Sequence, residues 1–73
     1  SAESRICILH KNVPAVLSSV SSLISEQGIN IDNMLNKSKG DYAYTIVDTS
    51  TSIEGDIVDK IQSVEGVIRV NLY

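Results

Sequence analysis

The order in which two hydrophobic periods follow one another constrains the fold of this 73-residue chain most. Apolar residues recur at every second position in some stretches and at every third or fourth position in others, which are the periods of strands and of helices. Along the chain the periods indicate strand, helix, strand, strand, helix and strand. This order predicts an α+β fold of the ferredoxin-like βαββαβ type, a sandwich in which a four-stranded antiparallel sheet carries two helices on one face.

The first half of the chain is expected to form one strand and one helix. Residues 4–10 are predicted as a strand, because Ile6-Cys7-Ile8-Leu9 is continuously apolar, as in a strand covered on both faces. A helix is expected from about residue 14 to 27, with Pro14 in its first turn and Asn12 or Val13 as its N-cap, Asn12 being the chemically better one. Gly28 is expected to end this helix in the left-handed conformation. Its predicted apolar face consists of Val16, Leu17, Val20, Leu23 and Ile24.

The second half is expected to form a hairpin, a helix and a last strand. Ile29, Ile31, Asn33 and Leu35 alternate with polar residues and predict the second strand, and a turn at Gly40 leads into a third strand over residues 41–48. In that third strand Tyr42, Tyr44 and Ile46 are predicted to share one face. Thr51 is expected to cap a second helix that ends near Val64. Residues 67–73 are predicted as the fourth strand, with Ile68, Val70 and Leu72 facing one way.

Composition excludes several classes of function. The net charge is −3 and the six Lys and Arg side chains are scattered, whereas a nucleic-acid-binding domain is expected to carry a basic stripe. No apolar run reaches the length of about 20 residues that a membrane span needs, and no signal peptide is visible. A lone Cys7 gives no disulfide framework, which favours a reducing, cytoplasmic location, and one Cys with one His cannot build the usual zinc site. No Ser/His/Asp set, carboxylate pair or phosphate loop is visible, so no catalytic residue is expected.

Size predicts one domain with a tendency to associate. Residues 1–3 are expected to be the remnant of a cleaved tag or a linker, and residues 4–73 to be the domain. A domain this small buries a low fraction of its surface and is marginally stable alone. The predicted fold also leaves one sheet face and two strand edges uncovered. These features favour self-association.

The turn between the first strand and the first helix is the candidate binding site. The stretch from His10 to Leu17 contains the only histidine and the only proline of the chain. The first turn of a helix leaves about four backbone amides without intrahelical partners, and a carboxylate is a suitable guest for them. The side chains of His10 and Asn12 add hydrogen-bonding groups at the same place.

The motif around this turn carries a resemblance to a known family. Two segments of the chain resemble an ACT domain. The first is His10-x-Asn12-x-Pro14 with a small residue and Val16-Leu17, and the second is Gln27-Gly28-Ile29-Asn30-Ile31. They resemble in particular the C-terminal regulatory ACT domain of D-3-phosphoglycerate dehydrogenases. The similarity extends over residues 4–73 and includes Asp41-Tyr42-Ala43-Tyr44 and Gly66-Val67-Ile68-Arg69-Val70.

The resemblance implies an amino-acid-binding homodimer. In those enzymes the regulatory domains pair side by side, so that two sheets join, and L-serine, the end product of the pathway, binds between them. By motif position His10 and Asn12 of one chain and Asn30 of the other would hold the ligand. The full set of ligand-binding residues that the resemblance implies is His10, Asn12, Pro14, Ala15, Asn30 and Ile31. No cofactor or metal is expected in this segment, and NAD and the oxidoreductase chemistry belong to the catalytic domains of the implied parent enzyme.

One departure from the family leaves alternatives open. Ala15 occupies the position where the family usually has glycine, which permits a close approach of backbone and ligand. A dimerisation module that has lost its ligand is therefore one alternative. An ACT domain of another protein of amino-acid metabolism is the second, and an unrelated ferredoxin-like enzyme or binding domain is the third.

Overall fold

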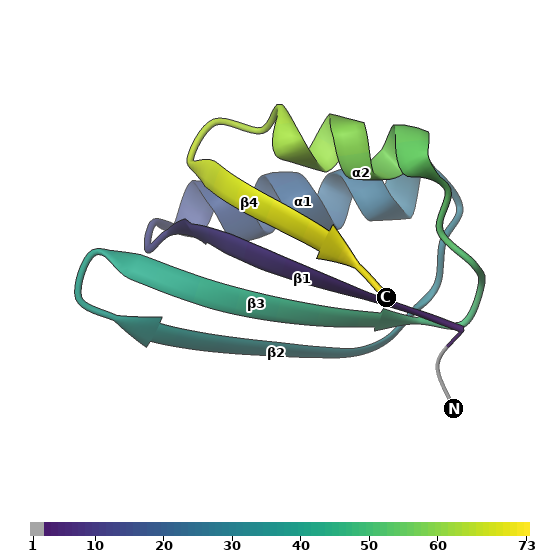
Figure 1. The fold of residues 1–73 in the computed structure, drawn as a ribbon, viewed down its shortest axis with the longest axis horizontal. Helices are drawn as coiled ribbons and strands as arrows, with labels where there is room; N and C mark the ends of the chain where they lie inside the picture. The colour runs from purple at the N-terminus through teal and green to yellow at the C-terminus, as the bar shows by residue number, and fades with distance from the viewer. Residues whose placement is uncertain (1–2) are drawn as a thin grey trace.

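The computed structural model describes residues 3–73 and confirms the predicted ferredoxin-like fold. The elements are β1 (Ser4–Lys11), α1 (Pro14–Glu26), β2 (Ile31–Lys39), β3 (Tyr42–Thr49), α2 (Gly55–Gln62) and β4 (Val67–Leu72). The antiparallel sheet has the strand order β2-β3-β1-β4, and both helices cover one of its faces (Figure 1). The expected linker over residues 1–3 falls mostly outside the described residues, since only Glu3 is described and it donates from its amide to Thr49.

The hydrophobic core lies between the sheet and the two helices. The members with the least exposure are Ile6, Ile8, Val16, Val20, Ile24, Val47 and Ile61, each at 0 or 1%. Burial of each such side chain stabilises the fold by about 1.5–3 kcal/mol. The predicted apolar face of α1 is confirmed at Val16, Val20 and Ile24, whereas Leu17 is only half-buried.

The preferred cap of α1, Asn12, and the predicted cap of α2, Thr51, are wrong, whereas the alternative cap Val13 is confirmed. The N-cap of α1 is Val13, which makes no side-chain hydrogen bond, and Asn12 instead donates from its amide to the carbonyl of Gly40. Helix α2 begins at Gly55 after Glu54, not after Thr51. The loop before it is held by the hydrogen bond from Ile53 N to Ser4 Oγ, which carries Ile53 into the core at 7% exposure. Tertiary contacts therefore decide where each helix starts.

Two bulges correct the predicted strand faces. In β2 the pairing steps from Ile31↔Thr49 to Asn33↔Asp48, so Asp32 is an extra residue and the alternation shifts by one position. Ile31 and Met34 consequently contact the core, while Leu35 is 47% exposed on the opposite face. In β4 the pairing steps from Leu9↔Arg69 to His10↔Val67, so Ile68 is an extra residue. Ile68 is 46% exposed, whereas Val67 and Val70 contact the core. Two predictions are therefore wrong. Leu35 does not share a face with Ile31, and Ile68 does not share a face with Val70 and Leu72.

The two edges of the sheet differ. On the outer edge of β4, the side chain of Gln62 donates from Nε2 to Ile68 O at 3.2 Å and accepts at Oε1 from Val70 N at 3.2 Å. This amide occupies two of the backbone groups that another strand would use, the carbonyl of Ile68 and the amide of Val70. Among residues 3–73 no side chain makes such bonds to the backbone of β2 from Ile31 to Lys39. The edge of β2 is therefore the one available for pairing.

Gly66 is the glycine that the packing requires. Its φ is +96°, and an added Cβ would lie 2.7 Å from Cγ2 of Val16. We expect Gly66→Ala to lower the free energy of unfolding by about 1–3 kcal/mol, because the backbone is strained and Val16 is displaced. Urea unfolding followed by circular dichroism measures this change.

Gly55→Ala is the matched control. Gly55 has no positive φ, and an added Cβ meets nothing within 4 Å. Its substitution is expected to leave stability unchanged or raise it by up to about 1 kcal/mol. Equal losses in the two variants would contradict the packing role of Gly66.

Candidate functional site

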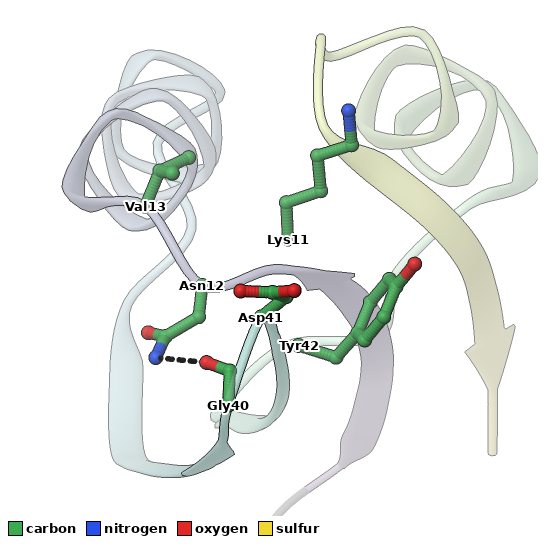
Figure 2. Close-up of a pocket in the computed structure, with 6 residues that line it drawn as sticks. All are labelled: Lys11, Asn12, Val13, Gly40, Asp41 and Tyr42. Atoms are coloured by element: carbon green, nitrogen blue, oxygen red, sulfur yellow. Dashed lines mark hydrogen bonds between the residues drawn. The ribbon is translucent and has the colours of Figure 1, made fainter.

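A cavity of about 370 Å³ lies where two turns meet at one end of the sheet (Figure 2). Lys11, Asn12 and Val13 line it from the turn between β1 and α1, and Gly40, Asp41 and Tyr42 line it from the turn between β2 and β3. The turns meet because β1 and β3 are antiparallel and Lys11 pairs with Tyr42.

Asn12 joins the two turns. Its backbone amide donates to Asp41 O at 2.8 Å. Its side-chain Nδ2 donates to Gly40 O at 3.0 Å, as Figure 2 shows. Gly40 adopts a φ of +61°, which closes the hairpin at this point. Asn12 therefore fixes the shape of the cavity and lines its wall at the same time.

The cavity is lined by charges of both signs. The ammonium group of Lys11 and the carboxylate of Asp41 both belong to lining residues, and no ion pair joins them in the described part of the chain. Several backbone amides of the turn are already in use, because Lys11 N donates to Gly66 O and Val13 N donates to Lys11 O. Pro14 has no N–H, so the helix start offers fewer free donors than the sequence led us to expect. The recognition groups of this cavity are thus mainly side chains.

A second cavity of about 370 Å³ lies on the other side of Lys11, between the start of α1 and the turn into β4. Ala15 lines this second cavity rather than the first. No non-glycine residue among the described ones has a positive φ, so the backbone at Ala15 accommodates its methyl group without strain.

His10 lies behind the first cavity and lines neither of the two. It is 2% exposed, and its Nδ1 donates to Lys11 O at 2.8 Å while its Nε2 lies 2.7 Å from Thr45 Oγ1. A hydrogen bond from His10 to a ligand would require one ring nitrogen to exchange its present partner. Contact of His10 with a ligand stays a prediction.

Asn30 and Ile31 lie at the opposite end of the sheet. Asn30 Nδ2 donates to Ser50 Oγ at 3.2 Å, and Ile31 pairs with Thr49, which in turn pairs with Ser4 at the start of β1. Asn12 follows the far end of β1. Within one chain the two halves of the predicted site are therefore separated by the length of the sheet, and they can meet only between two chains.

An ion pair lies away from both cavities. Arg5 donates from Nε to Asp48 Oδ1 at 2.8 Å and from Nη2 to Oδ2 at 3.1 Å. The hydrogen bonds and positive charge of Arg5 hold the pKa of Asp48 below its usual range, although partial burial opposes this effect. The pair adds stability at neutral pH that is lost as the pH falls through the lowered pKa of Asp48. This pair is structural in character.

Two further classes of site find no support in the described residues. Residues 3–73 contain no group of three or more His, Cys, Asp or Glu side chains that could hold a metal ion. None of the helices in this part of the chain is long and apolar enough to cross a membrane.

Of the residues that line the first cavity, the sequence predicted Asn12 as a site residue but not Lys11, Asp41 or Tyr42. The strand order could have indicated them. The turn after β2 and the turn after β1 lie at the same end whenever β1 and β3 pair antiparallel, so residues of the hairpin turn are neighbours of the first turn.

The substitution Asn12→Ala tests whether the side chain of Asn12 holds the two turns together. Loss of one hydrogen bond is expected to cost about 0.5–1.5 kcal/mol of stability and to speed hydrogen exchange in the turn around Gly40. Asn71→Ala, an exposed asparagine on β4, is the control and should change neither quantity. Unchanged exchange around Gly40 in Asn12→Ala would show that Asn12 does not join the turns.

Comparison with known proteins gives one family and a consistent fold. The model of the AHAS small subunit-like ACT domain matches residues 6–69. D-3-phosphoglycerate dehydrogenase 1 of Saccharomyces cerevisiae is 36% identical over 55 residues, and D-3-phosphoglycerate dehydrogenase 2 of the same organism is 30% identical over 71 residues. These matches cover 75% and 93% of this chain but only 11% and 15% of the two relatives.

Solved structures agree with the fold. The ACT domain from GTP pyrophosphokinase of Chlorobium tepidum superposes with a TM-score of 0.79 at 19% identity, covering 96% of this chain and 95% of that one. The regulatory subunit of aspartate kinase from Thermus thermophilus gives a TM-score of 0.77 at 13% identity, covering 96% of this chain and 49% of that one. At these identities the likeness concerns the fold alone.

Proposed function

This chain belongs to the AHAS small subunit-like ACT domain family, and from that premise we propose that it is the amino-acid-sensing regulatory domain of a D-3-phosphoglycerate dehydrogenase, with L-serine as its effector. The two dehydrogenases from Saccharomyces cerevisiae support the choice of parent enzyme. NAD and the catalytic residues of such an enzyme belong to its other domains. The observation that carries the proposal is the cavity between the two turns, which is lined by Lys11, Asn12 and Asp41.

The lining groups match the chemistry of a free amino acid. Lys11 suits the α-carboxylate and Asp41 suits the α-ammonium group of such a ligand. Asn12 offers an amide that can hydrogen-bond the hydroxyl of L-serine. An exposed ion pair contributes only about 0.2–1 kcal/mol, so the charges give little affinity while the cavity stays open to water. A second chain that covers the cavity would strengthen them.

The free edge of β2 supports a particular dimer. Because Gln62 occupies the edge of β4, we propose that two copies pair antiparallel through β2. The nine-residue strand Ile31–Lys39 has Leu35 at its centre, which places the two-fold axis near this residue. In that arrangement Asn30 and Ile31 of one copy lie beside the turn of Gly40 in the other. The half-site around Asn12 then gains the residues that one chain cannot supply.

Regulation follows from this geometry. A ligand that touches both copies stabilises the paired arrangement, because it binds the pair and not the separate chains. At a concentration 100 times its dissociation constant, such a ligand adds about 2.7 kcal/mol. This amount is enough to change how the domains of a parent enzyme are arranged.

Isothermal titration tests the effector. We expect saturable binding of L-serine to the dimeric chain and weaker binding of glycine and L-alanine, which lack the hydroxyl. Asn30→Ala is expected to weaken L-serine binding by about tenfold, while Asn71→Ala leaves it unchanged. A dimer that gives no heat with any of the three amino acids would contradict the sensor and leave a dimerisation module.

The guarded edge of β4 is tested separately. Gln62→Ala exposes Val70 N and Ile68 O, so we expect concentration-dependent species larger than a dimer in sedimentation velocity. Gln27→Ala, at the exposed end of α1, is the control and should remain a dimer. If Gln62→Ala sedimented like the unchanged chain at every concentration, Gln62 would not be what limits pairing to β2.

A further inference from the structure

A chain of hydrogen bonds, buried at its middle link, runs from the candidate site across three strands. It begins at the carbonyl of Lys11, passes through the ring of His10 on β1 and the hydroxyl of Thr45 on β3, and ends at the side-chain amide of Asn36 on β2. The three links measure 2.8, 2.7 and 2.8 Å. His10 is 2% exposed and Thr45 is 1% exposed, whereas Asn36 is exposed at the edge of the sheet.

The donors and acceptors of this chain depend on one another. A carbonyl only accepts, so Nδ1 of His10 must donate to Lys11. If Nε2 carries no proton, the Thr45 hydroxyl must donate to it, and Asn36 must then present its NH₂ group to Thr45. If Nε2 carries a proton, it donates to Thr45, which donates to Oδ1 of Asn36. The orientation of the exposed Asn36 amide is therefore set by the buried ring.

The chain connects two functional places. Its inner end is the carbonyl of Lys11, which also accepts the amide of Val13 in the wall of the cavity. Its outer end, Asn36, is the neighbour of Leu35 at the centre of the free edge of β2. No buried side-chain N or O atom among residues 3–73 lacks a partner, so the chain is complete. Removing the Thr45 hydroxyl would leave the buried Nε2 of His10 without its partner.

We propose that His10, Thr45 and Asn36 are positioning residues that hold the effector site in register with the pairing edge of β2. This inference rests on the proposed function, and it assigns His10 a role through Lys11 and Thr45 that does not depend on contact with the ligand. A ligand that draws on Lys11 or Val13 shifts the carbonyl of Lys11, and the shift reaches the Asn36 amide through the ring and the hydroxyl. Pairing at β2 and occupancy of the cavity are coupled in this way.

The test uses two variants with matched controls. Thr45→Val keeps the shape of a buried side chain and removes the hydroxyl between His10 and Asn36. Thr49→Val removes a buried hydroxyl from the same strand, where it donates to Thr51 O at the other end of the sheet. Asn36→Ala is an exposed change that does not endanger folding, and Ser38→Ala alters the next residue on the same face of β2.

Three readouts are compared for each variant. The dimer dissociation constant is measured without ligand, and the affinity for L-serine is measured by calorimetry. The chemical shifts of the His10 ring nitrogens report the hydrogen bonding of Nε2. Thr45→Val and Asn36→Ala are expected to weaken both dimerisation and L-serine binding by about three- to thirtyfold. Thr45→Val should also change the ring-nitrogen shifts. The two control variants should change none of these quantities.

The outcomes separate this inference from the proposed function. L-serine binding with unchanged dimerisation and affinity in Thr45→Val and Asn36→Ala would overturn the positioning role and leave the sensor intact. Weakened dimerisation in these two variants, in a chain that binds no L-serine, would support the positioning role at the β2 edge and reject the effector. Equal losses of dimerisation and L-serine affinity in Thr45→Val and Thr49→Val, with unchanged ring-nitrogen shifts, would overturn the inference. The hydrogen bonds would then contribute only to the stability of the fold.

Discussion

The pairing of β1 with β3 is the interaction on which the rest of the structure depends. It runs without interruption from Ser4↔Thr49 to Lys11↔Tyr42 along the centre of the sheet. On one face this register places Ile6, Ile8 and Val47 under the helices, where they form the floor of the core. At its far end the same register brings the two turns together around Asn12. The cavity is thus a direct consequence of how the central strands are aligned.

The sequence predicted the order of the elements because hydrophobic period is a local property. The true helix starts could not be predicted, because they depend on distant contacts. Asn12 donates to Gly40, which is 28 residues away, and does not cap α1. The loop before α2 is held by the bond from Ile53 to Ser4, so Thr51 does not cap α2. The bulges at β2 and β4 are shifts in pairing with β3 and β1, so they depend on residues distant in the sequence. At the site, a motif identified Asn12, but the burial of His10 depends on Thr45, which lies 35 residues away.

The proposed pairing follows from the sheet surface and edges that the two helices leave uncovered. Two helices cover one face (Figure 1), and Gln62 occupies two backbone groups at the edge of β4, so the edge of β2 is the place proposed for a second copy. The cavity next to Asn12 is open and has charges of both signs, which bind weakly in water. Pairing through β2 would complete the sheet and close the cavity at once. The proposed sensor therefore depends on association, and the chain of hydrogen bonds through His10 links the two.

An isotope-filtered NOE spectrum of mixed labelled and unlabelled chains, recorded with L-serine, tests this claim most directly. Pairing through β2 predicts contacts between chains that are symmetric about Leu35, together with contacts from Asn30 of one copy to the turn of Asn12 and Gly40 in the other. Contacts between chains through β4 or through the open sheet face, with none along β2, would contradict it.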